Sequence, residues 1–232
     1  MVTAFYKPLM SRYILISLVV ALVTLVGCAG GSPGRISPPP EHTATCCRSV
    51  EAKSLRPAIV RTASRLVGAK TIDVDGRRIA YDCAGVTRAI YLQHGIDLYE
   101  GGHPDARANG VKLIHDHIRQ HGKLHQGPLA HPGDLVFFDN TWDFNRDGLN
   151  NDPLTHVGIV ERQEADGTIT FISRVAGAIA RYRMNLGLPH IHRTADGKVL
   201  NDYIRRKDGQ DPFDTAYLTG QLFAGFGTRT GL

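Results

Sequence analysis

The stretch Tyr81-Asp82-Cys83-Ala84-Gly85-Val86 continues into Thr87-Arg88-Ala89-Ile90-Tyr91-Leu92. Cys83, Val86 and Ile90 recur at helical spacing, which predicts a helix with one apolar face. Asp82 is a favourable N-cap residue, so we expect this helix to begin at Cys83.

A cysteine in the first turn of a helix lies close to unpaired backbone N–H groups and to the positive end of the helix dipole. Both favour the thiolate over the thiol, and the same N–H groups can hold an oxyanion that forms when the sulfur attacks a carbonyl. Cys83 is therefore a candidate nucleophile. The alternative is a buried structural cysteine.

Two further motifs follow downstream. Pro132-Gly133-Asp134-Leu135-Val136-Phe137-Phe138 predicts a turn and a buried strand, and Thr155-His156-Val157-Gly158-Ile159-Val160 predicts a strand that opens with a histidine. In this order, the cysteine at a helix start and these two motifs resemble the NlpC/P60 family and the related CHAP amidases. Both are papain-like cysteine hydrolases that cut amide bonds in bacterial peptidoglycan. The resemblance extends over about residues 55–185.

The resemblance implies an α+β papain-like fold with N-terminal helices packed on a central antiparallel sheet. It also implies Cys83 as nucleophile and His156 as its base. A predicted turn at 165–167 and a returning strand at 168–175 would bring Ser173 near His156, on the same side of the hairpin. Ser173 aligns with the residue that orients the imidazole, which in the family is usually His, Asn or a carboxylate. A water molecule or another residue is the alternative. Segment 70–76 departs from the family's Tyr-x-x-Gly-Gly pattern.

Segment 143–152 has the pattern of the start of an EF-hand calcium loop. Oxygen-bearing side chains alternate at the first, third and fifth positions, and a glycine, Gly148, stands at the sixth. The twelfth position, Leu154, lacks the usual carboxylate, so a residue elsewhere would have to replace it. An Asn- and Asp-rich surface loop is the alternative interpretation. The candidate calcium ligands are Asp143, Asn145, Asp147, Leu149 (through its carbonyl) and Asp152.

The N-terminal part of the chain predicts export and anchoring. Residues 1–27 combine early basic residues with an apolar run, as signal peptides do, and end in Leu25-Val26-Gly27-Cys28, which resembles a bacterial lipobox. We expect Cys28 to be lipidated. Residues 28–53 are rich in Pro and Gly and predict a tether, in which Cys46 and Cys47 have no assigned role. The catalytic domain is expected at 54–232.

The histidines between residues 103 and 131 are the remaining concentration of ligand-type side chains. Val111, Ile114 and Ile118 predict an amphipathic helix here. His115 and His117 are two positions apart and face different ways on such a helix, so a solvated helix face is favoured over a metal site.

Composition excludes little. A formal net charge of +5 is compatible with nucleic acid, but no basic run with interleaved aromatic residues accompanies it, so we expect no nucleic-acid partner. The sequence thus predicts a lipid-anchored enzyme of the bacterial cell envelope, on the outer membrane and facing the periplasm, that cleaves peptidoglycan amide bonds. Three alternatives remain: a non-catalytic peptidoglycan-binding lipoprotein, a lipid-directed thiol acyltransferase and a calcium-dependent adhesion module.

Overall fold

The computed structural model describes residues 54–104 and 109–232. The predicted signal peptide, the lipidation site at Cys28 and the tether lie outside the described residues. Within the described part, no helix combines the length and the apolar character needed to cross a membrane.

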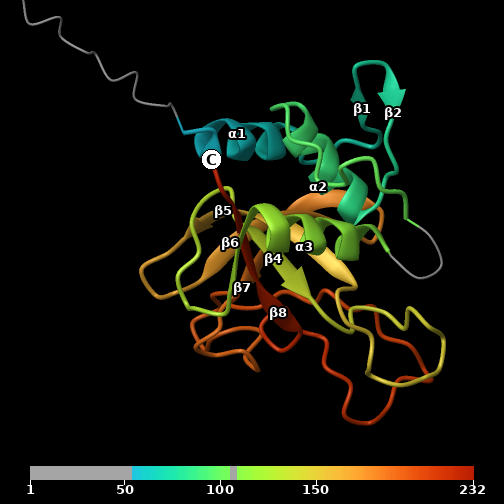
Figure 1. Cartoon of the computed structure of the whole chain (residues 1–232). Coiled ribbons are helices and arrows are strands. Elements are labelled where there is room, and N and C mark those ends of the chain that lie inside the picture. Colours follow the sequence, from blue (N-terminus) through green and yellow to red (C-terminus); the bar gives the residue numbers. More distant parts are fainter. Residues whose placement is uncertain (1–53, 105–108) are drawn as a thin grey trace, which may run out of the picture. The chain divides into compact units, whose positions relative to one another are not determined.

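The described chain folds as α+β, with three helices and a six-stranded antiparallel sheet (Figure 1). The strand order is β3-β8-β4-β5-β6-β7, so the last strand of the chain is inserted between β3 and β4. A separate two-stranded hairpin, β1–β2, precedes helix α2. The elements are α1 (Arg56–Arg65), β1 (Asp73–Val74), β2 (Arg77–Arg78), α2 (Cys83–Leu92), α3 (Gly110–His121), β3 (Gly122–His125), β4 (Leu135–Phe138), β5 (His156–Gln163), β6 (Ile169–Val175), β7 (Ala178–Met184) and β8 (Phe223–Arg229).

The two faces of the sheet have different coverings. Side chains such as Phe137 and Ile159 pack with the three helices in one apolar cluster. Phe138 and Phe171 point to the opposite face and pack with Ile204 and Leu222, which belong to the loop-rich segment between β7 and β8. Figure 1 shows the helices gathered on one side of the sheet. Alternation along each strand therefore directs neighbouring residues to two separate cores.

The Gly133-Asp134 pair ties the helices to the sheet. Asp134 is fully buried and accepts hydrogen bonds from Arg56 at the start of α1 (2.7 Å) and from Thr228 in β8 (2.8 Å). The hydroxyl of Tyr91 in α2 donates to the carbonyl of Gly133 at 2.6 Å. A buried carboxylate needs such partners to offset its desolvation, so this turn fixes where α1 and α2 sit on β4.

Most local predictions are confirmed. Helix α2 begins at Cys83 after the cap Asp82, β4 covers 135–138 and β5 opens at His156. The predicted helix with Val111, Ile114 and Ile118 buried is α3. The predicted return strand at 168–175 is β6, which begins one residue later. The structure thus confirms the predicted α+β class with a central antiparallel sheet.

Candidate active site

Cys83 is the first residue of α2, and its position is fixed from both sides. The Asp82 side chain accepts a hydrogen bond from the Gly85 N–H at 2.7 Å, which caps the helix. A Cβ atom on Gly85 would lie 2.0 Å from the carbonyl oxygen of Ala80, so only glycine lets the approaching chain pass this closely. The half-buried thiol is thereby held at the helix N-terminus.

His156 and Ser173 form the hydrogen bond that the hairpin geometry predicts. Their Nε2 and Oγ atoms are 2.8 Å apart, and Ser173 Oγ also donates to the carbonyl of Val157 at 2.6 Å. A serine hydroxyl has one proton to donate, and the Val157 carbonyl can only accept. Ser173 must therefore accept from His156, which places the proton of the neutral imidazole on Nε2 and leaves a lone pair on Nδ1.

Burial keeps both members of the pair uncharged. Burial raises the pKa of Cys83 to about 12, although backbone N–H groups including that of Val157 oppose the shift. Burial, followed by the charge of Arg174, lowers the pKa of His156 to about 3. The resting site at neutral pH is therefore a thiol beside a neutral imidazole, not a preformed ion pair.

Cys83 and His156 line the same pocket, which has a volume of about 800 Å³. Helix α2 and strand β5 supply them, and their elements are in contact. Among the described residues no hydrogen bond joins the thiol to the imidazole, so the two groups must come into hydrogen-bond contact before a proton can pass. Such catalytic hydrogen bonds are often long in the absence of substrate.

The pocket wall contains residues that sequence analysis missed. They are Arg174, next to Ser173 in β6, Trp142 after β4, and Tyr203, Arg205 and Arg206 from the segment before β8. The run Arg205-Arg206-Lys207 was the available signal. Arg205 is buried and pairs with Asp211 at 2.6 Å, so it anchors this segment. The segment after residue 186, which carried no motif, thus forms part of the site.

Arg174 has an unusual environment. Its guanidinium lies 5.2 Å from the centre of the Tyr81 ring, and its Nε is buried without a hydrogen-bond partner. No carboxylate in the described part of the chain pairs with Arg174 or with Arg206. Asp82 also lines the pocket but is not paired with either arginine. Within the described residues the pocket therefore contains two arginines that have no ion-pair partner.

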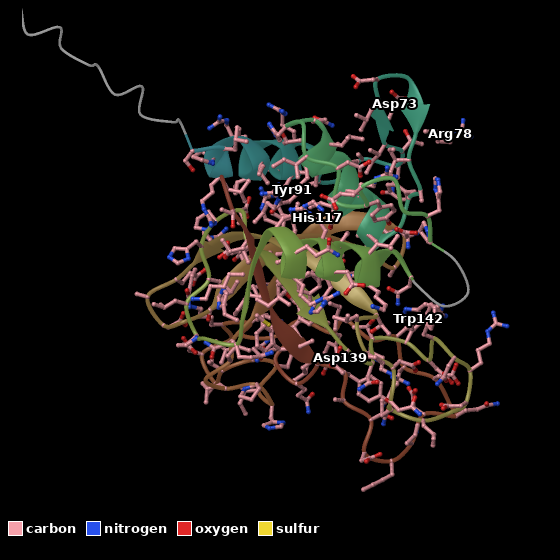
Figure 2. All side chains as sticks on the ribbon, in the orientation of Figure 1. Asp73, Arg78, Tyr91, His117, Asp139 and Trp142 are labelled. Carbon is pink, nitrogen blue, oxygen red and sulfur yellow. The ribbon has the colours of Figure 1, made fainter. Side chains whose placement is uncertain are left out.

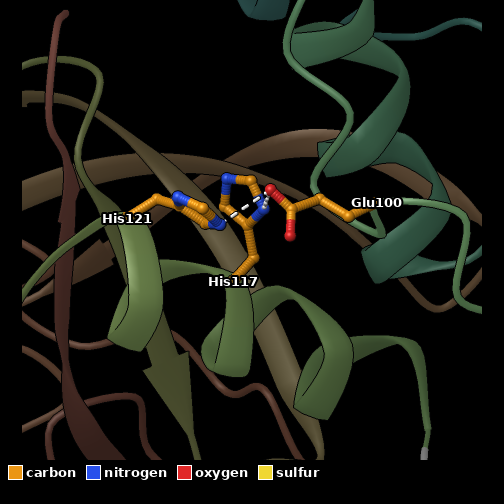
Figure 3. Close-up of side chains that lie close together, drawn as sticks. All are labelled: Glu100, His117 and His121. Atoms are coloured by element: carbon orange, nitrogen blue, oxygen red, sulfur yellow. Dashed lines mark ion pairs between the residues drawn. The ribbon is translucent and has the colours of Figure 1, made fainter.

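A second cluster joins His117 and His121 of α3 to Glu100 (Figure 3), and none of the three lines the active-site pocket. The Glu100 carboxylate is 2.8 Å from His121 Nε2 and 3.3 Å from His117 Nδ1. In the described residues these three side chains are the one set of His, Cys, Asp or Glu ligand atoms that gather within 4.8 Å. The prediction of a solvated helix face was wrong for His117, which is only 5% exposed because it packs beneath Glu100 and Arg229.

The hydrogen bonds of His117 oppose metal binding at this cluster. Arg229 Nε donates to His117 Nε2 at 3.1 Å, and a guanidinium cannot accept. The proton of the neutral ring is therefore on Nδ1, where a metal ion would have to bind. Nδ1 of His117 lies 3.3 Å from the Glu100 carboxylate but forms no hydrogen bond within the described residues. A protonated Nδ1 that faces a carboxylate cannot bind a metal ion, so the arrangement fits a carboxylate beside two imidazoles better than a metal centre.

The predicted calcium-ligand residues lie in the loop between β4 and β5, beside the pocket. Figure 2 labels Asp139 and Trp142, which precede this loop. Trp142 and Arg205 line both the active-site pocket and a smaller cavity that Asp143 and Gly148 border.

No protein-family model, no curated protein and no solved structure matches this chain. The function must therefore be argued from the geometry of the site.

Proposed function

We propose that the protein is a papain-like cysteine hydrolase of the bacterial cell envelope that cleaves amide bonds in peptidoglycan and is anchored by a lipid on Cys28. The observation that carries the proposal is the imidazole of His156. Ser173 fixes its tautomer so that Nδ1 is free to accept a proton, in a pocket that also contains a cysteine at a helix N-terminus.

The proposed reaction follows from these atoms. Nδ1 of His156 takes the thiol proton as the sulfur of Cys83 attacks the amide carbonyl. The imidazolium then gives this proton to the departing amine, which leaves a thioester on Cys83. Water attacks the thioester while Nδ1 again accepts a proton, and the carboxylic acid and the thiol are released. Ser173 accepts from Nε2–H throughout and supports the transient positive charge.

Backbone N–H groups near the sulfur have a second role. Those of Val157, Ala84 and Cys83 already lower the pKa of the thiol against the effect of burial. Donors placed there would also face the oxygen of the tetrahedral intermediate. The thiolate therefore needs to exist only transiently, which reconciles its high resting pKa with nucleophilic attack.

The charge of the pocket favours an acidic peptide substrate. Arg174 and Arg206 border the pocket and have no carboxylate partner in the part of the chain that the structure describes. Trp142 and Tyr203 offer half-exposed aromatic faces. Arginine binds carboxylates through paired hydrogen bonds. Peptidoglycan stem peptides carry free carboxylates, so these arginines would hold a carboxylate close to the scissile amide.

Digestion of purified peptidoglycan tests the proposal. The full-length chain and its Cys83→Ala variant would be incubated with intact sacculi, and soluble products would be identified by mass spectrometry. We expect new fragments from the wild type alone, and their masses distinguish an endopeptidase from an amidase. Sacculi left uncut by the wild type would overturn the hydrolase.

A peptidoglycan-binding lipoprotein is the second candidate. The observations that favour it are the pKa of about 12 for Cys83 and the lack, within the described residues, of a thiol–imidazole hydrogen bond. Co-sedimentation with sacculi separates the two, because a binding protein would sediment without producing fragments. A lipid acyltransferase is less favoured, since an acyl chain in this pocket would cover Arg174 and Arg206, which have no ion-pair partner in the described residues.

A further inference from the structure

The loop of residues 143–152 between β4 and β5 carries its oxygen atoms inward. Asp143 accepts from the N–H groups of Asp147 and Gly148, and Asp147 accepts from that of Leu149. The positive φ of Gly148, +77°, gives the sharp turn at the sixth position. These contacts shape the loop, but they do not by themselves indicate a ligand.

Asp152 gives the independent indication. Its side chain is only 5% exposed, and Oδ1 accepts from the N–H of Asn145, so the carboxylate points into the loop. Oδ2 is buried and has no hydrogen-bond partner among residues 54–104 and 109–232. The side-chain oxygen of Asn150 is likewise buried without a partner in that part of the chain. Unpaired buried oxygens are rare, because each loses its hydration without compensation.

Within residues 54–104 and 109–232, no basic side chain forms an ion pair with Asp143, Asp147 or Asp152. Arg205, Arg206 and Lys207 border the same cavity as Asp143 without pairing with it. Three carboxylates in one short loop therefore lack an ion-pair partner in the described part of the chain. A bound cation would supply that partner, together with the missing contact of the buried Asp152 oxygen.

We propose that this loop binds Ca²⁺ through side-chain oxygens of Asp143, Asn145 and Asp147, the Leu149 carbonyl and the Asp152 carboxylate. All these ligands are oxygens, which calcium prefers, whereas zinc prefers nitrogen and sulfur. Asp152, at the tenth position, takes the place of the carboxylate missing at Leu154. The three loop carboxylates do not gather within 4.8 Å as the chain stands, so calcium must draw them together.

The loop is tied directly to the ends of β4 and β5. The backbone of Asp152 pairs with Asn140 in both directions, at 2.8 Å from Asn140 N to Asp152 O and at 2.6 Å from Asp152 N to Asn140 Oδ1. The N–H of Leu154 donates to Asp139 at 2.7 Å. His156 follows two residues later. Calcium would therefore stiffen the segment that carries the catalytic imidazole.

Terbium luminescence offers a direct test, because the chain contains one tryptophan and it immediately precedes Asp143. Tb³⁺ replaces Ca²⁺ at oxygen sites and emits when a nearby indole is excited. With the full-length protein we expect Trp142-sensitised emission that Ca²⁺ displaces and Mg²⁺ displaces far less. The melting temperature should rise by roughly 5–10 °C when the free calcium concentration is 100 times the Kd.

Matched variants separate this site from adventitious binding. Asp152→Asn and Asp147→Asn keep the side-chain shape and should lose both the emission and the thermal shift. Asp196→Asn, an exposed residue in a distant turn, should change neither. Trp142→Phe should lose the emission but keep the shift. Circular dichroism verifies that each variant is folded.

The inference fails if calcium neither displaces terbium nor shifts unfolding, or if Asp152→Asn responds as the wild type does. These readouts do not depend on catalysis. Cys83→Ala should bind calcium normally, so failure of the proposed hydrolase and failure of the calcium site are distinguishable.

Discussion

Two buried histidines in this protein have opposite tautomers. His156 and His117 are 7% and 5% exposed, and each has one ring nitrogen fixed by a hydrogen bond. At His156 the partner is Ser173, which accepts; at His117 it is Arg229, which donates. His156 therefore presents a lone pair to a pocket, whereas His117 presents an N–H group to Glu100. The partner of the fixed nitrogen, more than burial, decides whether a histidine can act as a base.

The largest expected effect concerns catalysis. Replacing His156 by Gln removes the proton acceptor, and general acid–base groups contribute roughly 10²–10⁴-fold to rate. We expect peptidoglycan cleavage by His156→Gln to fall by that factor. The matched His117→Gln variant should stay within about twofold of the wild type, as measured by the rate of fragment release. Equal losses of cleavage rate in both variants would show that His156 has no role in cleavage that His117 lacks.

Ser173→Ala removes the group that fixes the Nε2 nitrogen of His156. It leaves the Nε2–H group of His156 buried without an acceptor and frees the ring to take the other tautomer, at a cost of about 1–3 kcal/mol. We expect kcat to fall roughly 10–100-fold with KM little changed. Ser173→Thr keeps the hydroxyl and should recover part of the rate. A rate for Ser173→Ala equal to that of the wild type would assign the orienting role to another group.

The two histidines also differ in how they affect stability in acid. The pKa of His156 falls from 6.5 in the unfolded chain to about 3 in the fold, so folding favours the neutral ring. Its contribution to stability is complete above pH 6.5 and is lost as the pH falls toward 3. Between pH 7.5 and 4.5 the loss amounts to about 3 kcal/mol.

Urea unfolding of the wild type and His156→Gln at these two pH values measures this loss. Acidification should lower the unfolding free energy of the wild type more than that of His156→Gln. His117→Gln should change less, because Glu100 opposes the effect of burial on the pKa of His117. If the unfolding free energies of the wild type and His156→Gln changed in parallel with pH, His156 would not be the buried neutral imidazole that loses stability in acid.

The sequence predicted the features that depend on local order. The cap at Asp82 and the helical spacing after Cys83 set the start of α2. Hairpin geometry was sufficient to place Ser173 beside His156, because both face the same side of adjacent strands. In each case a few consecutive residues determine the result.

Features that depend on distant contacts were missed. Strand β8, the last of the chain, lies between β3 and β4, and no motif indicated this placement. Its position depends on pairing with residues about 90 and 100 positions earlier. The state of Arg174 and the burial of His117 likewise follow from side chains that only the fold brings together.

The smallest expected effect is that of Glu100→Gln. The carboxylate is 47% exposed, and exposed ion pairs stabilise proteins by at most about 1 kcal/mol. The Gln carbonyl can still accept from His121, so we expect the melting temperature to fall by no more than about 4 °C. Peptidoglycan cleavage should be unchanged, because Glu100 faces N–H groups that take no part in the proposed reaction. A loss of cleavage comparable to that of His156→Gln would make the second cluster part of the catalytic machinery, and the contrast between the two histidines would then have to be abandoned.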